Sequence, residues 1–384
     1  MKTKEFDQKS RNWTKHNTML SLSTDVPVQR LMMPKRRSLL RRTIPFIIIG
    51  LLAFALYLIF FVNIDEMIAI IKRTNLSIYS LSAVATILEM GFFALAWHYF
   101  LKPLSVKASF QKTFIYSWIS NFVDLLVPAE SVSGEISRVY LITRDGVDAG
   151  KAVASIVTQR ILGTVIIIGA LTFGALQLLI MRIPFPSLIQ SLIFLVVTAS
   201  AIFLSFIFVL CFKENWTQGL LNKIFSLIER ISHGRWNLDG WRRKARKGVM
   251  EFHESIHFLG ANPEKLILPV GFSIFSWFCG VLVYYLVFAA IGYVLNWSIL
   301  IIVYTLVVAL KSIPVGIPAE FGVTDIAMTI LLGAFIGPEG LPIGAAATVL
   351  IRIITVWFRL IIGFCAVQWV GVKTLMESAD LTSQ

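Results

Sequence analysis

Two groups of charged residues each begin just after a proline and combine carboxylates with an arginine further along the chain. The first group is Glu130, Glu135, Arg138 and Arg160, and the second is Glu320, Asp325 and Arg352. A guanidinium group is a planar fork of donors that holds a phosphate through two parallel hydrogen bonds. A neighbouring carboxylate competes with that phosphate or couples its binding to a proton. These residue types therefore indicate binding of a phosphate-bearing substrate, with Arg160 and Arg352 as phosphate contacts, Arg138 beside them, and the carboxylates as gating or proton-coupling groups.

The two groups repeat one order of features, which indicates an internal duplication. The string Pro128-Ala129-Glu130 is followed by Glu135-Ile136, and Pro318-Ala319-Glu320, 190 residues later, is followed by Asp325-Ile326. In each case an arginine then lies one or two turns into a long apolar segment. One short string recurs easily by chance, but the joint match of a proline, two acids and a later arginine favours a repeat.

The composition assigns these groups to a membrane protein. The chain has 384 residues, of which 57% are hydrophobic and only 15% are charged. This composition excludes soluble enzymes and nucleic-acid-binding domains. A helix of about 20 apolar residues crosses the roughly 30 Å hydrocarbon core of a bilayer, and several runs here reach that length. Full crossings are predicted at 44–62, 78–101, 153–181, 188–212, 266–291 and 342–370.

Two further apolar stretches are each interrupted by a proline. Residues 113–127 meet Pro128, residues 297–313 meet Pro314, and a polar string follows each. Such breaks persist at membrane depth only where they are buried in protein or line a wet cavity. We therefore predict an all-α polytopic membrane protein with six full spans and two re-entrant helical hairpins. Because three full crossings separate the hairpins, they enter from opposite sides as inverted-topology repeats, an architecture typical of carriers.

The basic residues indicate the orientation in the membrane. In this topology the segments expected on one side carry 28 of the 35 Lys and Arg residues, and the loops expected opposite carry 3. Both termini are therefore predicted to be cytoplasmic, as is the basic amphipathic segment 213–265. Residues 1–43 are predicted to form a disordered basic tail, 44–370 the membrane domain and 371–384 a C-terminal tail. The net charge of +13 is assigned to anionic headgroups of the cell membrane rather than to nucleic acid.

The same residues resemble a known family. The string Gly134-Glu135-x-x-Arg138, the Arg160 span and the string from Pro318 to Asp325 are similar to the transmembrane region of lysylphosphatidylglycerol synthases and its stand-alone, flippase-like relatives. The resemblance covers about residues 44–370. It implies a lipid translocase that moves polar-headed lipids between leaflets, and the predicted inverted repeats suit alternating access.

The chain departs from this family in two ways. Asp325 stands where the family pattern has glutamate, and no soluble aminoacyl-transferase domain follows before residue 384. We therefore expect a stand-alone member that carries a lipid or a lipid-linked precursor and lacks synthase activity.

The charged pattern also has a purely structural interpretation. Each arginine can pair with a carboxylate of its own group and lock the helices together without binding a substrate. Outside the two groups, a structural hydrogen bond and a functional role are equally compatible with Glu89. Asp124 is interpreted either as the cap of a hairpin helix or as part of the cavity lining. Lys311 and Arg359 are interpreted as structural.

One motif indicates a different class of protein. The string His253-Glu254-Ser255-Ile256-His257 places two imidazoles on one helix face with a glutamate that can activate zinc-bound water. No third ligand follows at a suitable spacing, so we interpret it as a chance match in an amphipathic helix. We predict no enzyme activity, no metal and no cofactor. The alternatives are a zinc protease, a lipid-modifying transferase and a non-transporting scaffold for glycolipid or envelope assembly.

Overall fold

The computed structural model describes residues 52, 55–60, 63–127, 132–183, 186–231, 239–312, 317–337 and 340–382. The predicted basic tail, most of the predicted first crossing and Glu130 lie outside these residues. The chain divides into two units, Met1–Pro45 and Phe46–Gln384, and every helix discussed below belongs to the second.

The described residues form helices joined by short connections. In chain order these are α3 (Ile64–Lys72), α4 (Leu76–Leu101), η2 (Lys102–Leu104), α5 (Phe110–Leu126), α6 (Val132–Arg144), α7 (Ala149–Ile180), α8 (Ser187–Phe212), α9 (Glu214–Ile231), α10 (Asp239–Ala261), η3 (Pro263–Leu266), α11 (Ile267–Ala290), α12 (Trp297–Lys311), η4 (Pro318–Glu320), α13 (Val323–Ile336), α14 (Gly340–Arg352), η5 (Ile353–Phe358) and α15 (Arg359–Thr382). The prediction of an all-α membrane protein is confirmed by this helical content and by the apolar lengths described next.

Six helical segments of the described chain are long and apolar enough to cross a membrane, and the helix Trp297–Lys311 is apolar but shorter. Five of the six coincide with predicted crossings, namely Leu76–Leu104, Ala149–Ile180, Ser187–Phe212, Pro263–Ala290 and Gly340–Gly371. The sixth is Pro318–Ile336, which was expected to form only the return arm of a hairpin. This sixth segment includes η4, so its regular α-helix is the 14 residues of α13.

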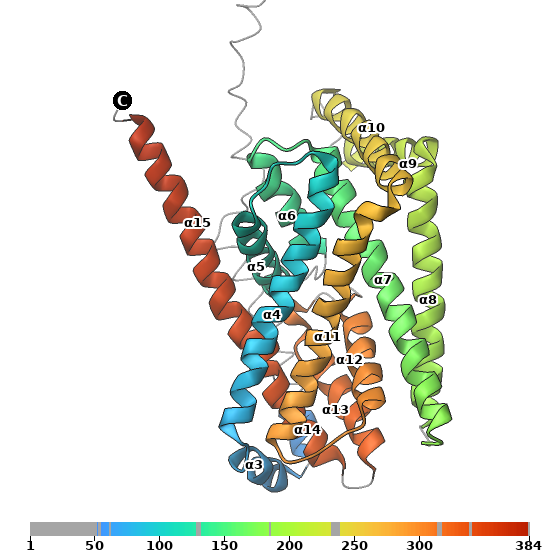
Figure 1. Ribbon diagram of the computed structural model, residues 1–384, viewed down its shortest axis with the longest axis vertical. Helices are drawn as coiled ribbons and strands as arrows, with labels where there is room; N and C mark the ends of the chain where they lie inside the picture. Colours follow the sequence, from blue (N-terminus) through green and yellow to red (C-terminus); the bar gives the residue numbers. More distant parts are fainter. Residues whose placement is uncertain are drawn as a thin grey trace, which may run out of the picture. The chain divides into compact units, whose positions relative to one another are not determined.

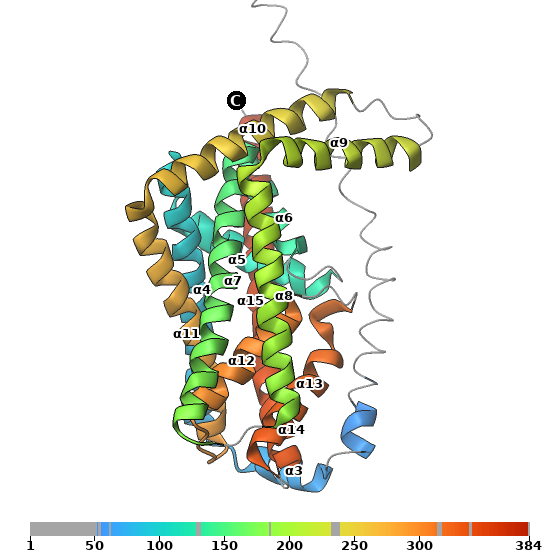
Figure 2. The ribbon, with the colours of Figure 1, turned by 90° about the vertical axis from the view of Figure 1, so that its right-hand side faces the viewer.

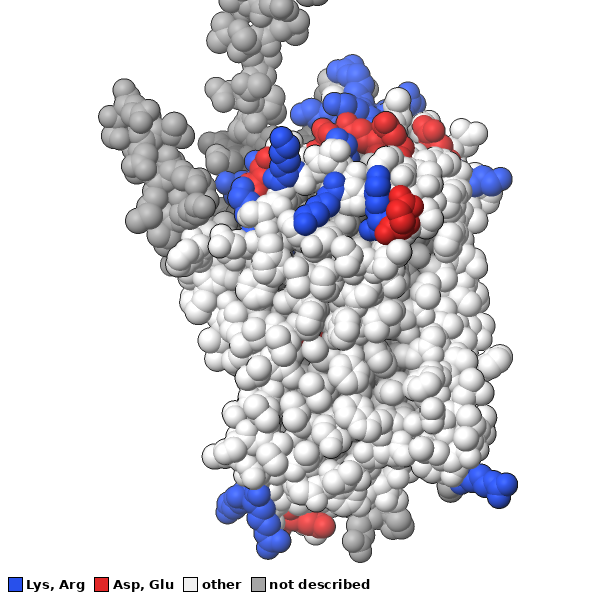
Figure 3. Space-filling model, viewed as in Figure 1, with Lys and Arg blue, Asp and Glu red and all other residues white. Residues whose placement is uncertain are grey.

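Within residues 46–384, the long helices that form the body of the unit have roughly parallel axes. Helices α4, α7, α8 and α11 run alongside one another (Figure 1), and α9 and α10 lie across one end of them (Figure 2). Lys and Arg side chains gather at the end where α9 and α10 lie, and a smaller number mark the end with α3 (Figure 3). The face between these two ends is uncharged in that view, as expected for a surface that contacts lipid.

Polar caps satisfy the first turns of several helices. The Asn75 side chain accepts hydrogen bonds from the backbone of Ser77 and Ile78 at the start of α4. Asn296 does the same for Ser298 at the start of α12. Asparagine is a strong N-cap because its side-chain oxygen accepts from a backbone N–H that has no partner within the helix. These helices can therefore begin without leaving exposed donors near the membrane.

Two pairs of shorter helices fill the space between the long ones. Helix α5 packs against α6. The segments that flank this pair both contact α10, namely η2 before α5 and the first residues of α7 after α6. Helix α12 contacts α13, and α14, which follows α13, packs against α3 at the other end. The end of α5 also contacts η4, where Leu125, Ala319, Phe321 and Val356 form a buried apolar cluster. The two pairs therefore start from different ends and touch in the interior.

Candidate functional site

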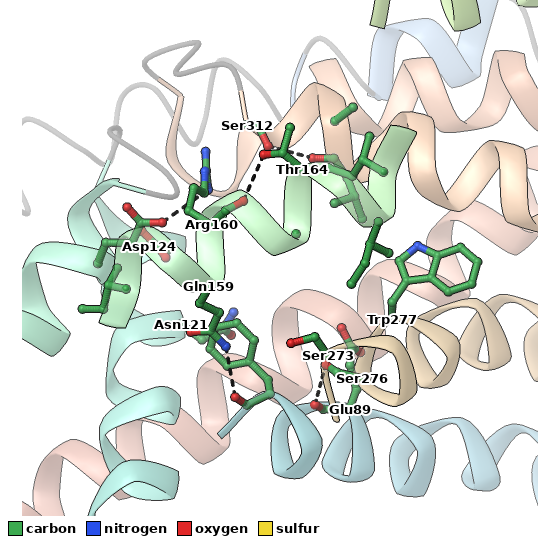
Figure 4. A pocket seen from close by; sticks show the side chains of 18 of the residues that line it. Glu89, Asn121, Asp124, Gln159, Arg160, Thr164, Ser273, Ser276, Trp277 and Ser312 are labelled. Atoms are coloured by element: carbon green, nitrogen blue, oxygen red, sulfur yellow. Dashed lines mark hydrogen bonds and ion pairs between the residues drawn. The ribbon is translucent and has the colours of Figure 1, made fainter. Parts of the chain in front are cut away.

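A cavity of about 500 Å³ lies between the two helix pairs and the long helices. Its lining comes from α4, α5, α6, α7, α8, α11, α12 and α15. Figure 4 shows Asp124 and Arg160 in one part of this lining and Glu89, Ser273 and Ser276 in another. Among the described residues, the charged ones in the lining are three carboxylates and three guanidinium groups, namely Glu89, Asp124, Glu135, Arg138, Arg160 and Arg359. Ionised groups are rare in membrane-spanning segments and usually mark a substrate or ion pathway.

Arg160 and Glu135 meet at the cavity wall. The Nη1 atom of Arg160 on α7 lies 3.4 Å from Oε1 of Glu135 on α6. Their side chains are 29% and 28% exposed, so the pair is accessible from the cavity. A long, half-exposed ion pair contributes little to stability and can open at low cost. Of the two carboxylates that the structural interpretation offers to Arg160, Glu135 is thus in contact with it, and Glu130 lies outside the described residues.

Asp124 caps the first turn of α6. Its Oδ1 accepts hydrogen bonds from Ser133 Oγ at 2.8 Å and from the Gly134 backbone N–H at 2.6 Å. A β-carbon at Gly134 would overlap Asp124 Oδ2, so this position requires glycine. A carboxylate at a helix N-terminus is stabilised by the free N–H groups and the helix dipole. Asp124 therefore fills both of the roles considered for it, since it caps α6 and also lines the cavity.

Arg138 is the most deeply held of the cavity arginines. Its residue is 4% exposed, and its Nη1 donates to Gln159 Oε1 at 2.8 Å. The guanidinium carbon also lies 5.0 Å and 5.1 Å from the ring centroids of Phe93 and Trp97. Arg138 thus stacks on two aromatic faces and donates to a neutral amide, while the carboxylates of Glu135 and Asp124 lie near enough to interact with its charge. Arg138 therefore adds positive potential to the cavity from a fixed position.

Sequence reasoning missed the pair formed by Glu89 and Arg359. Oε2 of Glu89 on α4 lies 2.5 Å from Nη2 of Arg359 on α15, and the side chains are 14% and 13% exposed. The residues are 270 positions apart, so their spacing carried no signal. Their separate positions in apolar spans were the only available indication, because an unpaired charge there is costly.

The second predicted group lies outside this cavity. Arg352 Nε is 2.6 Å from Asp325 Oδ1, and the two side chains are 6% and 3% exposed. Arg352 Nη2 also donates to the backbone oxygen of Ala319 at 2.6 Å, and Glu320 Oε2 accepts from Thr324 Oγ1 at 2.6 Å. None of Arg352, Asp325 and Glu320 is a lining residue of the cavity. The predicted pairing of Arg352 with a carboxylate of its own group is confirmed, but this pair is enclosed.

The enclosed pair supports an unusual backbone. Ala319 and Glu320 have φ angles of 48° and 49°, which non-glycine residues rarely adopt. Such conformations persist only where the surroundings over-determine them. Here Arg352 binds the Ala319 oxygen, and Asp325 Oδ2 accepts from the Gly322 N–H at 2.7 Å. The Arg352–Asp325 pair thus holds the turn that contacts the end of α5.

The two histidines of the H-E-x-x-H string differ in environment. His253 is buried, and its Nδ1 lies 2.9 Å from the backbone oxygen of Cys211 on α8. His257 is exposed on the same helix and packs edge-on against Phe212. Among the described residues, no group of three or more His, Cys, Asp and Glu side chains is placed to hold a metal ion. The buried stripe of Phe252, Ile256 and Leu259 matches the predicted amphipathic helix.

Membrane proteins of three organisms are similar to this chain over most of its length. A UPF0104 membrane protein of Methanocaldococcus jannaschii is 24% identical over 319 residues, which cover 82% of this chain and 90% of the relative. A UPF0104 membrane protein of Pyrococcus horikoshii is 24% identical over 329 residues, covering 83% and 94%. One of Methanothermobacter thermautotrophicus is 22% identical over 331 residues, covering 85% and 94%.

A family model gives the assignment. The model of the lysylphosphatidylglycerol synthase transmembrane region matches residues 47–363, which include the cavity and the enclosed pair. The resemblance drawn from the strings around Gly134 and Pro318 is thereby confirmed. The chain belongs to the family of the lysylphosphatidylglycerol synthase transmembrane region.

Proposed function

We propose that the protein is a lipid translocase that moves a phosphate-bearing, polar-headed lipid or lipid-linked precursor between leaflets by alternating access. The observation that carries this proposal is the cavity of about 500 Å³, whose lining combines three carboxylates and three guanidinium groups among otherwise apolar helices. A headgroup in this cavity would exchange water for fixed polar partners, while its acyl or isoprenoid tail stays in lipid. Membership of the family supports the same class of cargo.

The α5–α6 and α12–α13 pairs act in this proposal as the two re-entrant hairpins of an inverted repeat. At about 1.5 Å per residue, the 17, 13, 15 and 14 residues of these helices span about 20–25 Å, which is less than a hydrocarbon core. Contact between α5 and η4 supports two loops that approach each other in the interior. Alternating access then opens the cavity first to one leaflet and then to the other around a common site.

The Arg160–Glu135 pair is the entry contact for the headgroup phosphate. The phosphate displaces Glu135 because it can accept two parallel hydrogen bonds from the guanidinium fork. Arg138 contributes a fixed positive charge nearby, and Asp124 fixes the first turn of α6 that carries Glu135. Release requires Glu135 to return to Arg160. Glu130 completes the proposed set of gating carboxylates, whereas Glu320 and Asp325 of the enclosed group support the turn that contacts the end of α5.

We also propose an orientation with both termini in the cytoplasm of a cell or inner membrane. The end of the unit with α9 and α10 carries the larger group of Lys and Arg side chains (Figure 3). These two helices carry apolar residues such as Trp216, Leu220 and Trp241 on exposed positions. A basic amphipathic helix of this kind binds anionic headgroups at the membrane surface.

Arg160→Gln is expected to slow lipid movement by about tenfold or more, because a hydrogen bond to a charged group contributes about 1.5–3 kcal/mol. The measurement uses purified protein in vesicles that contain fluorescent phosphatidylglycerol, with an impermeant quencher added outside. Lys151→Gln is the matched control, since Lys151 is on the same helix and pairs with Asp148 at 3.2 Å outside the cavity lining. Equal rates for wild type and Arg160→Gln would contradict the role of Arg160, and equal rates for wild type and protein-free vesicles would contradict the function.

The purified wild-type protein is expected to hold no tightly bound zinc, and Glu254→Gln is expected to leave the movement of lipid unchanged. The residue is exposed on α10, and His253 already contacts a backbone oxygen. Elemental analysis of the purified protein, with and without added zinc, measures this directly. One equivalent of tightly bound zinc that is lost in His253→Ala, together with proteolysis that is lost in Glu254→Gln, would favour the zinc protease instead.

A further inference from the structure

The Glu89–Arg359 pair is a second carboxylate–guanidinium contact on the wall of the same cavity. Glu89 comes from α4 and Arg359 from the first turn of α15, and Ser276 of α11 donates to the Glu89 backbone oxygen at 2.9 Å. Both charged side chains are lining residues. The pair is shorter and less exposed than Arg160–Glu135, with 2.5 Å against 3.4 Å between the paired atoms.

Further donors on the cavity wall lack hydrogen-bond partners among the described residues. Within the part of the chain that the structure describes, Arg359 Nε, Ser273 Oγ and Trp277 Nε1 are buried atoms without a hydrogen-bond partner. Ser273 and Trp277 line the cavity together with Ser276, and Figure 4 shows Ser273 and Ser276 beside Glu89. Buried polar groups are almost always hydrogen-bonded in native proteins, so unpartnered donors on a cavity wall indicate a ligand with acceptor oxygens.

We propose that Arg359 is a second binding station for the headgroup phosphate, and that Glu89 occupies Arg359 until the phosphate replaces it. This inference rests on the proposed function. The phosphate enters at Arg160, which is the more exposed guanidinium, and passes to Arg359, where Ser273 donates to one of its remaining oxygens. Each station has a carboxylate from a neighbouring helix that reforms the ion pair on release. Two such stations on one cavity let the headgroup move by exchange of partners rather than by full loss of contacts.

The test separates binding from movement. Glu89→Gln removes the competing carboxylate, so dihexanoyl phosphatidylglycerol in detergent solution is expected to bind about tenfold more tightly by titration calorimetry. In vesicles the same variant is expected to move fluorescent phosphatidylglycerol about tenfold more slowly, because the phosphate stays on Arg359. In the double variant Glu89→Gln/Arg359→Gln the two side chains can still hydrogen-bond each other, but the guanidinium that binds phosphate is gone. This variant is expected to bind dihexanoyl phosphatidylglycerol more weakly than wild type and to move lipid at least about tenfold more slowly.

A structural role predicts different results. If the pair only joins α4 to α15, the double variant that keeps its melting temperature moves lipid at the wild-type rate, and this outcome overturns the inference. Arg359→Lys is the variant to use if the Gln variants do not fold, because it keeps the charge but cannot make the bidentate hydrogen bonds of a guanidinium. Unchanged binding and movement in Arg359→Lys would also overturn the inference. The matched control is Lys112→Gln/Asp145→Asn, which removes an ion pair of 3.0 Å outside the cavity.

The results also separate this inference from the proposed function. If wild type moves lipid, Arg160→Gln slows it and the Glu89 and Arg359 variants match wild type, only the second station is wrong. If wild type moves no lipid, the proposed function is wrong, and the calorimetric comparison of wild type with Glu89→Gln still decides whether Arg359 binds phosphate. Tighter binding in Glu89→Gln supports the station, and equal binding overturns it.

Discussion

Arg352→Ala is expected to lower the free energy of unfolding by about 3–5 kcal/mol, because it leaves the Asp325 carboxylate buried without a counter-charge. Asp325 is 3% exposed in its side chain, and its second oxygen is already used by the Gly322 N–H. The substitution also removes the donor to the Ala319 oxygen, which holds a turn with two left-handed non-glycine residues. The expected result is a large drop in the melting temperature of the detergent-solubilised protein and a low yield of folded material.

The double variant Arg352→Met/Asp325→Leu provides the control for this prediction. It removes both charges and fills a similar volume with apolar atoms, so much of the lost stability is expected to return. Unfolding of both variants is followed by the fluorescence of buried tryptophans such as Trp97 and Trp118. A loss of less than about 1 kcal/mol in the single variant would be typical of an exposed ion pair and would contradict the enclosed one.

Gly344→Leu is expected to destabilise the protein by about 1–3 kcal/mol, because it forces apart two helices whose backbones are in close contact. A β-carbon at Gly344 on α14 would lie 2.9 Å from the backbone oxygen of Thr329 and 3.1 Å from the backbone nitrogen of Gly333, both on α13. Gly340, four residues earlier on α14, also lies against α13. Gly340 and Gly344 together form a small-xxx-small motif, which allows membrane helices to approach closely. The hydrogen bond of 3.1 Å between Thr329 and Thr348 depends on this approach.

A graded series tests the steric origin of this effect. Gly344→Ala is expected to have a smaller effect than Gly344→Leu on the same melting temperature, since fewer atoms must be accommodated. Gly169→Leu is the matched control on α7, where an added β-carbon meets no atom of the described chain within 4 Å. Helix propensity favours leucine over glycine at both positions, so equal destabilisation by Gly169→Leu and Gly344→Leu would mean that the α13–α14 contact is not the cause.

Much of the fold could be predicted because it depends on length and hydropathy alone. Helices α4, α7, α8 and α11 are continuous apolar runs, and each begins or ends within a few residues of its predicted bound. The Arg160–Glu135 contact could also be predicted, because both residues belong to one local motif that precedes and enters α7. In these cases the relevant information lies within a short stretch of sequence.

The second arginine of the site could not be predicted in the same way. Arg352 and Arg359 are seven residues apart, which in a regular α-helix brings them close to the same face. The segment between them, Ile353–Phe358, is a π-helix, whose turns contain more residues than those of an α-helix. Each extra residue rotates the helix that follows by about 100° relative to a regular α-helix. Arg352 consequently binds Asp325 in the enclosed cluster, whereas Arg359 reaches Glu89 at the cavity. The sequence contains no glycine or proline in this segment that would have indicated the change.

The balanced charge of the cavity lining has an electrical consequence. With every ionisable group of the described lining charged, the three carboxylates cancel the three guanidinium groups. If the protein works by the proposed alternating access, its reorientation without cargo across an energised bilayer transfers no net charge from these groups. An anionic cargo adds about 2.3 kcal/mol per elementary charge for each 100 mV that it crosses. The voltage would thus drive the loaded transition and leave the return of the empty carrier indifferent to it, so the cargo's own charge sets the direction of net movement.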